Sequence, residues 1–223
     1  MVTSYEDNQR PGGGSRSSMD RAGPIVAFDF DGTLTTRDCF MAFLRWRIGP
    51  MSYWFGMARL FPAAVSYLFH RDPGRLKAKA VRVFLKGVPR ATLEGEALEF
   101  ASAAAPFLLR PDAVKTWRRY RHNGARLVIV SASPESIVAP FARGLGADLL
   151  IGTRLRFDMN DRVEGGFDGR NCRGQEKPKR IREVLGDDVR LAAAYGDTEA
   201  DRPMLAMADE KYMRLFVGDP GRG

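Results

Sequence analysis

The feature that most constrains the fold is the stretch of residues 25–35, IVAFDFDGTLT, an apolar run that ends in two aspartates and a glycine. A short apolar run with β-branched residues predicts an interior parallel strand, and Gly32 permits a tight turn directly after it. Ligand sites in open α/β sheets lie at the carboxyl ends of strands. Residues two apart on a regular strand also point the same way, so we expect Asp29 and Asp31 to face one site.

Two carboxylates held this close repel each other, and a bound divalent cation would best neutralise this repulsion. Mg²⁺ prefers a few oxygen ligands together with substrate phosphate oxygens. With such an ion, one carboxylate can attack phosphorus while the other carries protons. The alternative is a simple Asp-Gly turn whose second aspartate caps a neighbouring element, but the apolar strand directly ahead of Asp29 favours the site.

Composition limits the other classes of protein. The chain has 223 residues, of which 44% are hydrophobic, enough for one α/β domain with a sizeable insertion. Cys39 and Cys172 lie far apart, which gives neither a metal-binding spacing nor a disulfide framework and favours a reducing, cytoplasmic setting. Two histidines, His70 and His122, leave little room for histidine-based catalysis. The net charge of +8 suits phosphate, and no nucleic-acid signature accompanies it.

The chain alternates strands and helices around one long helical insertion. Residues 1–22 are rich in Gly, Ser and Arg and predict a flexible tail, whereas residues 23–37 and 113–223 predict an α/β core with a Rossmann-like parallel sheet. Residues 38–112 predict an inserted, all-helical cap domain. The later elements expected are helices at 111–123, 134–144 and from 177, strands at 127–130, 147–152, 191–195 and 213–217, and a hairpin of 154–157 with 162–167.

Three later segments place phosphate-handling residues where a strand meets a helix. Ser131 directly follows the strand LVIV, so its hydroxyl can donate to a phosphoryl oxygen. Lys177 lies where a helix begins, and a cation there neutralises a phosphate that the helix N-terminus also attracts. Asp197 and Asp201 lie four residues apart just past a strand and can share work on a metal. Each residue alone is more often a cap or a solvated side chain, but their order behind DFDGT is specific.

These four segments, taken in order, resemble the motifs of the haloacid dehalogenase superfamily of phosphohydrolases, over roughly residues 24–219. The helical insertion resembles the cap of its phosphoserine-phosphatase-like branch. The resemblance implies that Asp29 is the nucleophile that forms an aspartyl phosphate. It implies that Asp31 protonates the leaving oxygen and then activates water. Dehalogenating relatives lack this second acid, so Asp31 favours phosphoryl transfer.

The same resemblance implies the remaining roles. Mg²⁺ would be held by Asp29, the backbone carbonyl of Asp31, and Asp197, while Ser131 and Lys177 would bind the phosphoryl group. The supporting residues that it implies are Asp201, for the metal or for the lysine, and Gly32 and Thr33 of the DFDGT motif.

The insertion carries most of the excess charge, since residues 35–112 hold nine arginines and three lysines against six acids, a net charge of about +6. An anionic substrate or surface is therefore expected. Residues 39–69 are apolar and aromatic, but their charge-free runs are shorter than the roughly 20 residues that span a bilayer. Two interpretations stay open. These residues form the core of the cap, or Trp46, Trp54 and Phe55 form an interfacial patch that gives access to lipid phosphates at the inner face of the membrane.

We therefore expect a Mg²⁺-dependent phosphomonoester hydrolase, with a glycerophosphate or lipid-phosphate head group slightly ahead of phosphoserine. Asp38 falls where phosphoserine phosphatases carry an acid for the substrate amine, but Ala-Ser-Pro after Ser131 replaces their paired glycines. A phosphate-binding regulatory protein without turnover is a second alternative, and the intact acidic set argues against it. A phospho-receiver domain is a third, and the long insertion after the first strand argues against that.

Overall fold

The computed structural model describes residues 23–49, 51–56 and 73–222. The predicted tail at 1–22 and most of the second half of the aromatic stretch lie outside these ranges. Five parallel strands form the central sheet in the order β3-β2-β1-β6-β7, which confirms the predicted α/β fold with a parallel sheet. The strands are β1 (Ile25–Phe28), β2 (Arg126–Pro134), β3 (Leu149–Thr153), β6 (Leu191–Gly196) and β7 (Ala208–Met213).

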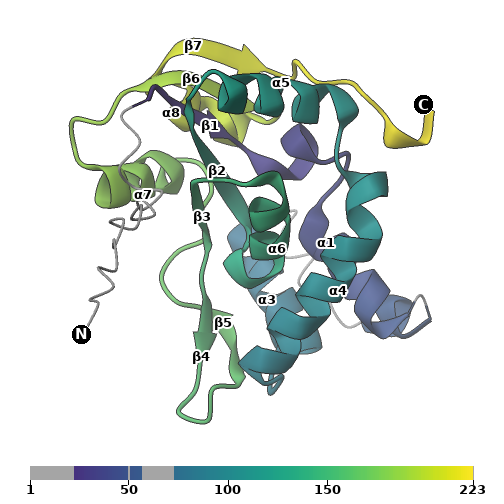
Figure 1. Ribbon diagram of the computed structural model, residues 1–223. Helices are drawn as coiled ribbons and strands as arrows, with labels where there is room; N and C mark the ends of the chain where they lie inside the picture. The colour runs from purple at the N-terminus through teal and green to yellow at the C-terminus, as the bar shows by residue number, and fades with distance from the viewer. Residues whose placement is uncertain (1–22, 50, 57–72, 223) are drawn as a thin grey trace, which may run out of the picture.

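Helices cover both faces of this sheet (Figure 1). Alternate residues of β1 divide between two apolar clusters, since Val26 and Phe28 pack on one face and Ala27 on the other. The first cluster joins α1 (Cys39–Ile48), α4 (Arg90–Leu108), α5 (Pro111–His122) and α6 (Glu135–Leu145) to the sheet, and the second joins α7 (Glu176–Leu185) and α8 (Arg202–Leu205). A sheet buried on both faces accounts for the near-continuous apolar runs of its inner strands.

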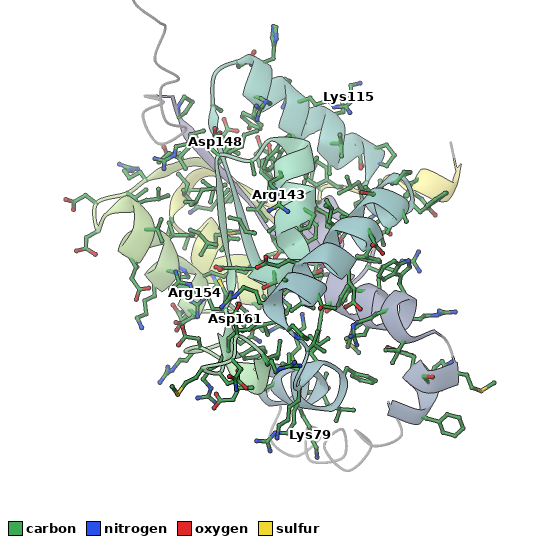
Figure 2. All side chains as sticks on the ribbon, turned by 60° about the horizontal axis from the view of Figure 1, so that its bottom comes forward. Lys79, Lys115, Arg143, Asp148, Arg154 and Asp161 are labelled. Carbon is green, nitrogen blue, oxygen red and sulfur yellow. The ribbon has the colours of Figure 1, made fainter. Side chains whose placement is uncertain are left out.

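Residues 38–112 supply the helices α1, α3 (Pro73–Leu85) and α4, and residues 51–56 are also helical. The predicted hairpin is present as β4 (Leu155–Phe157) and β5 (Val163–Phe167), which pair antiparallel. It lies beside α3, as Figure 2 shows through the labelled Asp161 of the hairpin and Lys79 of the helix. The hairpin therefore extends the helical insertion on the same side of the molecule.

Two predicted strand boundaries are wrong. The final strand is not 213–217 but β7, whose sequence ADEKYM has exposed polar residues because it is the edge of the sheet. Phe216 instead stacks on Tyr195 with ring centroids 5.2 Å apart, so its apolar character serves side-chain packing rather than strand pairing. The strand β2 also continues to Pro134, so Ser131 lies within the extended chain and not just after it.

Short connecting turns complete the chain: η2 (Phe30–Leu34), η3 (Glu199–Asp201) and η4 (Pro220–Arg222). In the described ranges, no helix combines the length and the apolar character needed to cross a bilayer.

Candidate active site

The carboxyl ends of β1, β2 and β6 meet at one edge of the sheet, and a cavity of about 330 Å³ lies there. Its lining joins the expected Asp29, Asp31 and Gly32 to Asp38, Lys177, Asp197 and Asp201, residues that lie up to 172 positions apart in the chain. Parallel strands bring these residues together because all of them end at the same edge.

Asp29 lies at the end of β1 with 5% of its surface exposed. Its Oδ1 accepts a hydrogen bond from Lys177 Nζ at 2.6 Å, and its Oδ2 accepts one from the Thr33 hydroxyl at 3.1 Å. Burial raises the pKa of Asp29 to about 7, and the Lys177 charge acts in the opposite direction. The carboxylate is thus poised between its two protonation states near neutral pH.

Asp31 shares the cavity with Asp29, but not through strand alternation, because β1 ends at Phe28 and the chain then turns. Asp31 Oδ1 accepts from the backbone N–H of Cys39 at 2.7 Å, and Oδ2 accepts from the Ser133 hydroxyl at 2.5 Å. Burial raises the pKa of Asp31, while the charge of Lys77 lowers it. The two aspartates therefore have separate partners, and burial favours a proton on Asp31.

Lys177 lies in the first turn of α7 and is 1% exposed. Its ammonium group contacts Asp29, Asp201 Oδ1 at 2.7 Å and the backbone carbonyl of Val130 at 2.9 Å. Burial alone would lower the pKa of Lys177, but the two neighbouring carboxylates raise it above its usual value. Lys177 is therefore a fixed cation whose three donors are all in use.

Asp201 and Asp197 have different surroundings although both follow β6. Asp201 Oδ2 accepts from the backbone N–H and the hydroxyl of Thr198, both at 2.9 Å, so both of its oxygens are occupied. Asp197 Oδ1 is buried, and in the described part of the chain it has no hydrogen-bond partner. Burial raises the pKa of Asp197. A buried acceptor without a donor costs free energy unless a further group satisfies it.

Oxygen atoms of Asp29, Asp197 and Asp201 lie within 4.8 Å of one another. Hard oxygen donors at this separation suit Mg²⁺, and the unpartnered Asp197 oxygen is the position such an ion would satisfy. Gly32 allows the close approach, because a Cβ on it would lie 2.2 Å from Asp197 Oδ2 and its φ of +85° is rarely adopted by other residues. The donor set therefore fits a divalent cation.

Ser131 does not lie at the cavity, where the sequence predicted it. It is fully buried and does not line the cavity, whereas its neighbour Ala132 does. Its hydroxyl oxygen accepts from the backbone N–H of Ser133 at 3.0 Å and lies 3.4 Å from Asp31 Oδ2. Ser131 thus contacts the chain of β2 and Asp31 rather than the space of the cavity.

Asp38 lines the cavity but is already engaged. Its Oδ1 accepts from the backbone N–H of Met41 at the start of α1, and its Oδ2 pairs with Lys77 at 3.0 Å. Lys77 comes from α3 and also approaches Asp31 Oδ2 at 3.9 Å and the Ser133 hydroxyl at 3.4 Å. The Asp38 charge is therefore balanced by a lysine of the protein itself.

The sequence did not indicate Lys77, Ser133, Arg37 or Arg173, of which all except Ser133 line the cavity. Ser133 had a usable signal, because residues 131 and 133 share one side of an extended chain. Lys77 lies in a basic amphipathic helix, where its neighbour Lys79 looks the same, so nothing local distinguishes it.

Comparisons with known proteins show the family and the fold of the chain. The model for haloacid dehalogenase-like hydrolases matches residues 26–206. Protein CicA of Caulobacter vibrioides is 62% identical over 196 residues, covering 88% of each chain. A "probable phosphatase" of Mycobacterium tuberculosis is 35% identical over 106 residues, covering 45% of this chain and 34% of that protein.

Solved structures share the fold at lower identity. A protein of unknown function from Bordetella pertussis Tohama I matches with a TM-score of 0.68 and 20% identity, covering 85% of this chain and 88% of that one. A phosphoserine phosphatase, solved as an analogue of its phospho-aspartyl intermediate, matches with a TM-score of 0.57 and 19% identity over 85% of each chain. At such identities the likeness concerns the fold.

Proposed function

The chain belongs to the haloacid dehalogenase-like hydrolase family, and we propose that it hydrolyses phosphomonoesters through an aspartyl phosphate formed on Asp29. The observation that carries the proposal is the cavity in which two aspartates with separate partners, the buried Asp29 and the partly buried Asp31, lie beside the fixed cation Lys177. Phosphoryl transfer needs mainly positioning and positive charge, and these residues supply both.

In the first half-reaction, a carboxylate oxygen of Asp29 attacks phosphorus and forms a new P–O bond while the bond from phosphorus to the ester oxygen breaks. The departing oxygen takes the proton of Asp31, whose pKa is raised by burial. Lys177, held by Asp201, stabilises the charge that spreads over the phosphoryl oxygens and holds Asp29 in position.

In the second half-reaction, the ionised Asp31 takes a proton from water, and the water oxygen attacks phosphorus. The bond between phosphorus and Asp29 breaks, which releases inorganic phosphate and restores the Asp29 carboxylate. Asp31 ends with the proton that it needs for the next turnover. The hydrogen bonds from Ser133 and Cys39 favour its ionised form during this step.

We propose Asp29, the backbone carbonyl of Asp31, and Asp197 as the ligands of Mg²⁺, with Asp201 acting on Lys177 rather than on the metal. Two observations support this assignment. The buried Oδ1 of Asp197 has no hydrogen-bond partner among the described residues, and both oxygens of Asp201 already accept hydrogen bonds. When bound, the ion supplies positive charge that neutralises the reacting phosphate and lowers the pKa of Asp29.

We also propose that residues 38–112 act as a cap over a core made of residues 23–37 and 113–223. Lys77 from α3 lines the cavity and supports this division. The substrate proposed is a glycerophosphate or a lipid-phosphate head group rather than phosphoserine, because Lys77 already neutralises the Asp38 carboxylate that would bind an amine.

A phosphate-binding regulator without turnover would not need the proton-carrying Asp31, so the intact pair of aspartates supports an enzyme. A cytoplasmic protein that contacts anionic membranes peripherally is in keeping with the exposed Trp54 and Phe55, at 66% and 71% exposure. Aromatic side chains of this kind favour the membrane interface.

Release of inorganic phosphate tests the proposal. The purified full chain is assayed with a panel of soluble and lipid phosphomonoesters, in Mg²⁺ and in a chelator. We expect Mg²⁺-dependent release and, with a fast substrate, trapping of an acid-stable phosphoprotein that the Asp29→Asn variant does not form. Absence of turnover on every phosphomonoester, with phosphate still binding, would favour the regulator instead.

A further inference from the structure

A second cavity, of about 590 Å³, lies between α1 and α4 next to the catalytic cavity. Its walls are mainly apolar, formed by Ala42 and Trp46 of α1 and by Phe100, Ala104 and Phe107 of α4. Arg37 lines both this groove and the catalytic cavity. The groove and the catalytic cavity therefore adjoin at Arg37.

Both walls of the groove start beside the segment that connects β1 to α1. The helix α1 begins directly after Asp38, and its groove residues recur at helical spacing as far as Gly49, about 16 Å along the axis at 1.5 Å per residue. The last turn of α4 is tied to the same loop, since the backbone N–H of Thr36 donates to the Leu108 carbonyl at 2.9 Å. The two helices thus lead the groove away from the reacting phosphate.

The groove surface is ordered although it faces solvent. Trp46 stacks on Phe43 with ring centroids 6.2 Å apart and packs against the tilted ring of Phe100 at 5.7 Å, yet 40% of Trp46 is exposed. Phe107 is 67% exposed. Arg37 and Arg45 border these aromatic residues. An apolar floor between cations suits a molecule that is apolar along its length and anionic at its end.

Resting on the proposed function, we infer that this groove binds an apolar chain carried by the alcohol of the phosphomonoester, so that the substrates are amphiphilic phosphates. The phosphate occupies the catalytic cavity, Arg37 lies at the junction, and the chain lies along α1 and α4. Continuity through Arg37 favours the substrate itself as the occupant over a second protein.

Calorimetric binding of alkylphosphonates tests the inference without requiring turnover, because their P–C bond is not hydrolysed. Chains of two, four, six and eight carbons are titrated in Mg²⁺ below their aggregation concentrations, so that monomers and not a membrane surface are measured. We expect affinity to rise roughly threefold per methylene, near the factor of four that about 0.8 kcal/mol per buried CH₂ gives.

The variant Phe107→Ser should flatten this dependence on chain length. A matched control is Leu98→Ser, which alters another exposed apolar residue of the same helix, 54% exposed, that lies outside the groove. Leu98→Ser should keep the slope of the wild-type protein.

Affinity that is independent of chain length in the wild-type protein would overturn the inference, and so would equal slopes in Phe107→Ser and Leu98→Ser. Chain-dependent binding together with no turnover of any phosphomonoester would uphold the groove but refute the proposed hydrolysis, so the two failures are distinguishable.

Discussion

The catalytic edge of the sheet and the helical insertion use charge in opposite ways. At the sheet edge, Lys177 is fully buried and all three of its donors contact fixed acceptors. At the insertion, Arg45 of α1 and Arg37, which directly precedes the insertion, are exposed and border an apolar groove. Buried charges must be paired to be tolerated, whereas exposed ones remain free to meet a ligand. In the proposed function, the first region carries the reaction and the second admits the substrate.

Because of this contrast, the two regions should respond differently to substitution. Changes at the sheet edge should alter the chemical step, and changes in the insertion should alter pH dependence, binding or surface properties. Lys77 is the intermediate case, because it belongs to α3 but contacts Asp31 and Asp38.

The largest expected effect follows Asp29→Asn. The amide keeps the volume but is not a competent nucleophile, so turnover should fall at least about a thousandfold, which corresponds to roughly 4 kcal/mol in the barrier. Steady-state phosphate release measures the effect, and a thermal melt close to that of the wild-type protein serves as the control. Retention of more than about a thousandth of the wild-type rate would rule out covalent catalysis through Asp29.

Metal dependence gives the next largest effect. A chelator should abolish activity, and Asp197→Ala should raise the Mg²⁺ concentration required at least about tenfold, because the open buried oxygen of Asp197 is lost. Titration of activity with Mg²⁺ checks this. Full activity of the wild-type protein in metal-free buffer would contradict the assignment.

The raised pKa of Asp29, about 7, sets the pH dependence of metal binding. Below pH 7 the metal-free protein holds a proton there, so Mg²⁺ must displace it and apparent affinity should rise with pH until about 7 and then level off. Without metal, the free energy of unfolding has the opposite trend. The folded state binds this proton more tightly than the unfolded chain, so the contribution of Asp29 to stability falls as the pH rises from about 4 to about 7. Calorimetry across this range measures both. Affinity that is independent of pH would show that Asp29 is not a ligand.

A smaller effect is expected for Lys77→Met. Loss of the Lys77 charge should raise the pKa of Asp31 further, and the acidic limb of the kcat profile should move up by about one pH unit. Lys77→Arg should restore the profile in part. Lys79→Met removes an exposed lysine of the same helix, visible at the edge of Figure 2, and should leave the profile in place. Identical shifts for the two methionine variants would refute a specific action on Asp31.

The smallest effect on stability is expected for Trp54→Ser with Phe55→Ser. Both side chains are more than half exposed, so the double variant should change the free energy of unfolding by less than about 1 kcal/mol. Trp117→Ala is the matched buried change and should cost roughly 3–5 kcal/mol. Thermal melts compare them. A strongly destabilised double variant would place these residues in a core after all.

The same double variant tests whether Trp54 and Phe55 contact membranes. The wild-type protein should bind anionic vesicles more than neutral ones, and binding should weaken as salt rises through about 0.15 M, where the screening length falls to roughly 8 Å. The double variant should bind less. Equal binding of both proteins to anionic vesicles would leave the aromatic pair without this role.

Much of the parallel sheet, and most of the residues that line the cavity at its edge, could be predicted from the amino-acid sequence. The run at 25–35 predicted β1, the hairpin was placed within a residue of its observed strands, and the four motif segments predicted that Asp29, Asp31, Lys177 and Asp197 would meet. This was possible because apolar runs and turn residues are local signals, and because parallel strands that share an edge bring their ends together.

Which side chains face the cavity, and which partners they have, depends on the tertiary structure and could not be predicted from the sequence pattern. Ser131, expected to donate to a phosphoryl oxygen, is fully buried, and the hydroxyls of Ser131 and Ser133 donate to Asp31 Oδ2 at 3.4 and 2.5 Å. Lys77 and Lys79 are alike in sequence, but packing of α3 sends Lys77 to Asp31 and leaves Lys79 exposed. Contacts between distant segments depend on the orientation in which helices pack, and neither residue type nor periodicity encodes this orientation. The groove beside Arg37 also depends on how α1 and α4 pack.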